Sequence, residues 1–128
     1  MNDTTQRAMR LCDEFARVAE AQLKNDDVAL QRIESKMAEI QPRVDAAMQR
    51  LVNAVMMGQQ MNKTDKEIQN DPAFIDASFE MIDLLAVIMV TGLGEFNSKA
   101  LVSDALKKDK EVIALLQKRA PIMAKLCA

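Results

Sequence analysis

The sequence of 128 residues contains no histidine, no tryptophan and no tyrosine. Without histidine, Ser–His and Cys–His nucleophile pairs are impossible, and no metal site can include an imidazole ligand. Two cysteines are too few for a structural zinc site. Gly92-Leu93-Gly94 is only a fragment of the dinucleotide-binding motif, and P-loop and EF-hand patterns are missing. We therefore expect a protein that is not an enzyme and that uses no cofactor or metal.

Turn formers and aromatic residues are also scarce, with three glycines, three prolines and 3% aromatic residues. Few aromatic residues argue against an all-β fold. The remaining composition is 49% hydrophobic and 28% charged, which is typical of a globular chain, and it is dominated by helix-forming residues. These properties predict an all-α fold, a single helical domain over residues 1–128.

Long uncharged apolar runs are absent as well. The most apolar uncharged stretch is Leu84–Gly94, whereas a membrane span needs about 20 apolar residues. The charged and polar N-terminus does not resemble a signal peptide. We therefore expect a cytoplasmic protein with reduced thiols, although the sequence leaves open whether Cys12 and Cys127 are bridged.

A regular apolar repeat with alternating spacings of three and four residues occupies the first half of the chain. Such spacing is typical of a long helix packed against other helices, as in a coiled coil. It predicts a helix over residues 27–57 that is kinked at Pro42 but keeps its phase across that residue. The repeat consists of Leu30, Ile33, Met37, Ile40, Val44, Ala47, Leu51 and Ala54.

A shorter helix over residues 4–24 precedes this one, opened by a capping box of Asp3 and Gln6. A turn at Asn25-Asp26 joins the two, so residues 1–58 are predicted to form a long antiparallel helical hairpin. The apolar seam expected for the first helix consists of Ala8, Leu11, Phe15 and Val18.

The rest of the chain predicts a linker with a short helix, then three further helices. Residues 59–71 contain a second capping box, which starts at Thr64. Asp71 and Pro72 open a central helix, apolar on most sides, that Gly92 is expected to end. Residues 72–128 then add two C-terminal helices, one from about Asn97 or Ser98 to Lys107 and one from Asp109 that bends near Pro121. The whole is a bundle of about five to six helices.

The long helix exceeds its predicted hairpin partner by roughly three turns. This overhang is apolar, and either the helix over residues 72–91 or another protein chain must cover it; we favour the first. Methionine is frequent at this end, and ten methionines in the chain serve either core packing or an adaptable binding surface. The candidate partner-binding residues are Met48, Leu51, Val52, Val55, Met56, Met57 and Met61.

Two charged features suggest alternatives. The basic residues of the C-terminal segment either contact phosphates, form a solvated face or pair with the acidic stretch before them. The net charge of −2 does not favour binding to nucleic acid. They are Lys107, Lys108, Lys110, Lys118, Arg119 and Lys125. Asp76, Glu80 and Asp83 share one helix face, which would suit a divalent cation, a solvated surface or pairing with the basic final helix.

Together these patterns favour a small helical protein that binds another protein, as an adaptor, chaperone, inhibitor or assembly subunit, or that associates with itself as a homodimer. A nucleic-acid-associated regulator is the alternative from another class, and a carboxylate-only metal-binding protein is the third.

Overall fold

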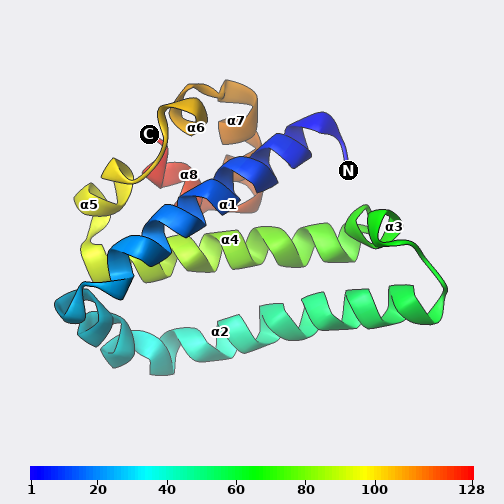
Figure 1. The fold of residues 1–128 in the computed structure, drawn as a ribbon, viewed down its shortest axis with the longest axis horizontal. Coiled ribbons are helices and arrows are strands. Elements are labelled where there is room, and N and C mark those ends of the chain that lie inside the picture. The colour runs from blue at the N-terminus through cyan, green and yellow to red at the C-terminus, as the bar shows by residue number, and fades with distance from the viewer.

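The computed structural model describes residues 1–128 and contains helices as its only regular elements, so the all-α prediction is confirmed (Figure 1). The helices are α1 (Asp3–Lys24), α2 (Asp27–Gln60), α3 (Asp65–Gln69), α4 (Pro72–Leu93), α5 (Glu95–Ala100), α6 (Asp104–Lys108), α7 (Lys110–Arg119) and α8 (Pro121–Leu126). No helix combines the length and the apolar character that crossing a membrane requires.

Side-chain caps set most of the helix starts that were predicted. The Asp26 carboxylate accepts a hydrogen bond from the Ala29 N–H at the start of α2, and Thr64 with Glu67 forms a complete capping box on α3. Asp71 caps α4, with Pro72 as its first residue. The box of Asp3 and Gln6 was wrong, because Asn2 caps α1 by accepting from the Thr5 N–H.

The helix ends differ more from prediction. Gly92 lies inside α4, which ends at Leu93 and has Gly94 as its C-cap, where a φ of 84° suits a residue without a Cβ. Ser103 caps α6 and Asp109 caps α7, while Pro121 begins α8. These cap and start residues divide the C-terminal segment into four short helices, so the chain has eight helices where about five to six were expected.

A long antiparallel pair does organise the fold, and its two members are α2 and α4 (Figure 1). α2 continues through Pro42 as a single curved helix, as its unbroken repeat predicted. Ile40, Ala47 and Ala54 of the repeat are buried, and Gly58 extends it by one position. The sequence therefore located the packing face of α2 correctly.

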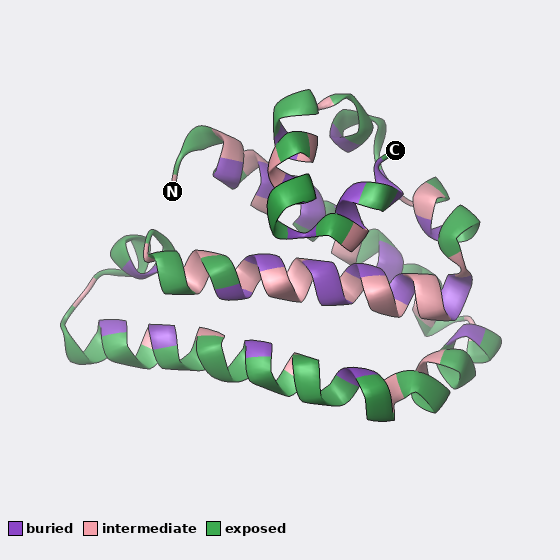
Figure 2. Cartoon of the chain, turned by 180° about the vertical axis from the view of Figure 1, so that it is seen from behind, coloured by how far each residue is buried: buried purple, intermediate pink, exposed green.

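The partner of that face was predicted wrongly. α1 makes its main contacts with α7 and touches α2 only weakly, so residues 1–58 do not form the expected long hairpin. The reason is that α4 is apolar on most sides: one face packs on α2, while another joins α1, α7 and α8 in the core. Figure 2 shows buried and half-buried residues along α4, whereas the outer side of α2 is exposed.

The main hydrophobic core lies between α1, α4 and the C-terminal helices. α1 contributes Phe15 and Ala19, whereas Val18 of the predicted seam is 49% exposed. The buried stripe of Ala8, Cys12, Phe15 and Ala19 has spacings of four, three and four residues, so it shares Ala8 and Phe15 with the predicted seam but continues to Ala19 instead of Val18. The other large core side chains include Phe79, Met89, Leu106, Leu116, Met123 and Leu126. Cys12 and Cys127 are both buried as free thiols.

Candidate functional site

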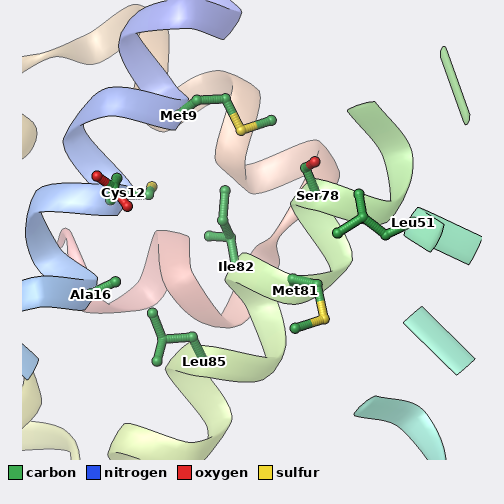
Figure 3. Close-up of a pocket in the computed structure, with 9 residues that line it drawn as sticks. Met9, Cys12, Ala16, Leu51, Ser78, Met81, Ile82 and Leu85 are labelled. Carbon is green, nitrogen blue, oxygen red and sulfur yellow. The ribbon is translucent and has the colours of Figure 1, made fainter. Parts of the chain in front are cut away.

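An open groove lies between α1 and α2, with α4 as its floor. In the close-up of Figure 3, α1 and α2 stand on either side of α4, and the labelled side chains point into the space between them. The groove measures about 400 Å³. Its apolar side chains are Met9, Cys12 and Ala16 from α1, Met81, Ile82 and Leu85 from α4, and Leu51 from α2.

The groove extends towards the turn that joins α1 to α2. A second hollow of about 520 Å³ shares Ala16 and Leu85 with the first, and it adds Leu23 and Leu30 as apolar walls. Glu20 and Lys24 stand at its edge. We call the two hollows together the α1–α2 groove. The two hollows adjoin at Ala16 and Leu85, and most of their lining side chains are apolar.

The structure divides the seven candidate partner-binding residues between two sides of α2. Leu51 lines the α1–α2 groove, and Met48 and Val55 lie three residues before it and four after it, along the same side of the helix. Val52 lies four residues after Met48 and three before Val55, so it adjoins both. Met57 instead lines a separate hollow of about 350 Å³ on the opposite side, with Arg50 and Asn53. Met61 follows Met57 by four residues. Met56 is half-exposed and lines none of these hollows.

Much of this apolar surface is accessible to solvent. Met48, Val52, Met56, Met57 and Met61 are each between 45% and 65% exposed. The seam itself is covered within the chain, as favoured from the sequence, because Ala47 and Ala54 are buried where α2 packs on α4, and Gly58 lies against Ile68 of α3. The two flanks of α2 beside the seam remain exposed to solvent.

Several lining residues were not recognised in the sequence. Met9 and Ala16 of α1, together with Met81, Ile82 and Leu85 of α4, form most of the groove. The sequence feature that could have indicated them is the apolar character of α4 on nearly all sides, because α2 alone covers only part of that apolar surface. The predicted hairpin pairs α1 directly with α2, and such a pairing leaves no groove between these two helices.

Cys12 brings a thiol to the wall of the groove. Burial raises the pKa of Cys12 to about 12, with a smaller contribution from nearby Cys127, and burial raises the pKa of Cys127 to about 11. A thiol with such a pKa is protonated at neutral pH and is a poor nucleophile or metal ligand. The side chain therefore acts as part of the apolar wall.

The three carboxylates of the central helix have separate partners. Asp76 pairs with Arg119 at 2.6 Å, Glu80 pairs with Arg43 at 3.3 Å, and Asp83 accepts from the Ile122 N–H at 2.8 Å. No group of three His, Cys, Asp or Glu side chains in the chain is arranged to hold a metal ion. Of the three alternatives for this helix face, the contact of Asp76 with Arg119 corresponds to pairing with the basic C-terminal segment.

The basic residues of the C-terminal segment are mostly free of ion pairs. Arg119 pairs with Asp76, and Lys99, which precedes this set, pairs with Glu95. The Arg119 guanidinium also lies 5.2 Å from the centre of the Phe79 ring, so it is held in the fold. Lys107, Lys108, Lys110, Lys118 and Lys125 are exposed on α6, α7 and α8.

Comparisons with family models, curated proteins and solved structures give no match to this chain. The groove, its exposed apolar walls and its charged edges are therefore the observations from which a function is inferred.

Proposed function

We propose that this protein is a non-enzymatic interaction module that binds a partner protein in the α1–α2 groove. The observation that carries the proposal is the groove itself. Its floor and walls are apolar and open to solvent, formed by half-buried residues such as Met9, Met81 and Leu85. Exposed apolar side chains that are gathered in one place commonly mark an interaction site, whereas isolated ones are normal on any protein surface.

The methionines favour a protein partner over a small ligand. Met9, Met48 and Met81 have long unbranched side chains, which adjust to the shape of an incoming apolar surface. The groove is open along its length and lacks the converging polar groups that orient small ligands. Both properties suit an elongated apolar element of another protein.

A matched pair of double variants tests the proposal. Met48→Glu with Val52→Glu places charge along the groove side of α2, and Met57→Glu with Met61→Glu places equal charge on the opposite side. All four side chains are about half-exposed or more, so both variants are expected to keep their helical circular dichroism. A partner is isolated by affinity capture, purified, and its binding to each variant is measured by calorimetry.

The proposal predicts that the first variant loses partner binding by at least about tenfold, while the second binds as the unmodified protein does. Equal binding by both variants would contradict a site in the groove. Light scattering on the same samples measures self-association and separates a homodimer from a complex with another protein.

The basic C-terminal segment supports a second candidate, a regulator that binds nucleic acid. Its five exposed lysines without an acidic partner are the favouring observation. Binding to duplex DNA that weakens steeply with salt, and that is lost when Lys107, Lys108 and Lys110 become glutamine, would support this alternative. The absence of binding at low salt would remove it.

A further inference from the structure

The basic residues of α2 gather on one of its flanks, where Glu39 is the one acid and pairs with Lys36 at 3.8 Å. Arg32, Lys36, Arg43 and Arg50 follow one another at intervals of four, seven and seven residues, so they share a flank. Arg50 lines the hollow on the side opposite the α1–α2 groove. Arg43 pairs with Glu80 at 3.3 Å, and the Arg32 guanidinium donates to the Gly92 carbonyl oxygen at 3.3 Å, so this basic flank turns towards α4.

The flank of α2 that borders the groove carries only acids. Glu34 lies one turn after Leu30, which lines the groove, and Asp45 lies one turn before Met48. Neither carboxylate makes an ion pair, although Asp45 accepts a hydrogen bond from Gln41 at 2.7 Å. We call this border of the groove, defined by Glu34 and Asp45, the acidic edge.

The opposite border of the groove, on α1, is electrically balanced. Asp13 pairs with Arg17 at 3.0 Å, and Glu20 is followed one turn later by Lys24. The uncompensated charge beside the groove is therefore that of the acidic edge of α2. An occupant gains from positive charge on the side that meets α2, and from apolar side chains beneath.

The shape of the groove suits an α-helix. Its α1 wall extends from Met9 to Lys24, roughly 22 Å at 1.5 Å per residue, which is about four helical turns. Two helices form its walls and a third forms its floor, so an added helix would complete a four-helix arrangement. An amphipathic helix fills such a groove with residues at positions i, i+3, i+4 and i+7.

We infer, on the basis of the proposed function, that the partner element is an amphipathic helix with lysine or arginine along the border that meets α2. Charge argues against a second copy of this chain in the groove. In a two-fold dimer the same surface meets itself, so α2 packed on α2 would set Glu34 and Asp45 against the acidic edge of the other copy. Like charges facing one another oppose that arrangement.

Three synthetic helical peptides test the inference. Each has about 18 residues, or five turns, and carries leucine at i, i+3, i+4 and i+7. They differ only in the residues flanking that stripe, which are lysine, glutamine or glutamate. Binding of each fluorescent peptide to the full chain is measured by anisotropy at low and at high ionic strength. The lysine peptide is expected to bind about three- to tenfold more tightly than the glutamine peptide, and the difference is expected to shrink with salt.

Paired variants assign the preference to the acidic edge. Glu34→Gln with Asp45→Asn is expected to abolish the preference for lysine while leaving the affinity for the glutamine peptide unchanged. Glu39→Gln with Glu95→Gln removes the same charge elsewhere on the surface and is expected to keep the preference.

The outcomes separate this inference from the proposed function. If the three peptides bind equally in the groove, the charge inference is overturned and the protein-binding function stands. If no peptide binds and Met48→Glu with Val52→Glu also leaves partner binding intact, both fail. A dimer that dissociates in that same variant, with no peptide bound, would identify a second copy as the occupant and overturn the inference.

Discussion

The carboxylate of Asp83, in the middle of α4, accepts a hydrogen bond of 2.8 Å from the backbone N–H of Ile122 in the first turn of α8. The residue at the N-cap of α8 is Ala120, whose side chain has no acceptor. A side chain 39 residues earlier therefore satisfies one of the free N–H groups at this helix start. Asp83 is itself buried, so this contact joins the last helix to the central one.

Replacing Asp83 tests this long-range cap. Asp83→Ala is expected to lower the free energy of unfolding by about 1–3 kcal/mol, because it leaves the Ile122 N–H without a partner. Asp83→Asn keeps a carbonyl acceptor and is expected to cost less. Urea denaturation of both variants measures the difference, and equal stability of the two would contradict the capping role.

Close packing at Gly58 gives a second prediction. A Cβ at this position would lie 2.4 Å from Cγ1 of Ile68 on α3. Gly58→Ala is expected to destabilise the fold by about 1–3 kcal/mol, even though alanine favours a helix by about 1 kcal/mol over glycine. In an Ile68→Ala background the clash is removed, so the same substitution should become neutral or stabilising. A double-mutant cycle measured by thermal unfolding checks this coupling.

The ion pair between Arg7 and Asp109 predicts sensitivity to acid. Arg7 Nε lies 3.0 Å from Asp109 Oδ2, and this hydrogen bond is the main cause of the lowered pKa of Asp109. Since the folded pKa lies below that of the unfolded chain, about 3.9, the stabilisation is complete above that pH and is lost as pH falls through the folded pKa. Melting temperatures between about pH 2 and 5 should fall with acid.

Two variants separate this ion pair from other acid effects. Asp109→Asn and Arg7→Gln should each flatten the fall of stability with acid, because one removes the carboxyl and the other removes the group that lowers its pKa. An unchanged pH dependence in both variants would show that other groups govern the acid response.

The buried thiols predict slow chemical labelling. Because burial raises the pKa of Cys12 to about 12 and that of Cys127 to about 11, both remain protonated and shielded at neutral pH. A disulfide reagent such as Ellman's reagent should react slowly with the native protein and completely in denaturant. Rapid release of two thiolate equivalents under native conditions would contradict the buried placement, and Cys12→Ser would show which thiol reacts.

Two methionines provide a contrast between surface and core. Met57 is exposed and Met89 is fully buried in the core. Met57→Ala should change stability by no more than about 0.5 kcal/mol, whereas Met89→Ala should cost about 2–5 kcal/mol. Chemical denaturation of both variants measures this. A large cost at Met57 would show that this part of α2 is covered, and would remove it from the accessible surface.

Local features of the fold were predictable from the sequence where they depend on neighbouring residues. Thr64 with Glu67 formed the expected capping box, Asp71 with Pro72 opened α4, and α2 continued through Pro42. Each of these depends on hydrogen bonds or periodicity within a few turns of helix. The packing face of α2 was predictable for the same reason.

The choice of helix partners was not predictable in this way. The apolar face of α1 fits α2 or α7 equally well by pattern, and the difference lies in contacts between α1 and α7, two helices from opposite ends of the sequence. Gly92 illustrates the problem: it resembles a helix end, yet in the fold it allows Ile33 to approach α4, since a Cβ there would lie 2.8 Å from Ile33 Cδ1. The groove depends on this arrangement, so only its α2 wall was identified from the sequence.

The position of α8 has a consequence for the order of folding. Met123, Ala124, Leu126 and Cys127 complete a core that α1 begins at Ala8, so this core closes only when both ends of the chain are in place. The α2–α4 pair needs only the middle of the chain and can form earlier, during synthesis, while α1 still lacks its partners. A chain that stops before α8 would then present both the α1–α2 groove and an unfinished core, the state most exposed to aggregation and proteolysis.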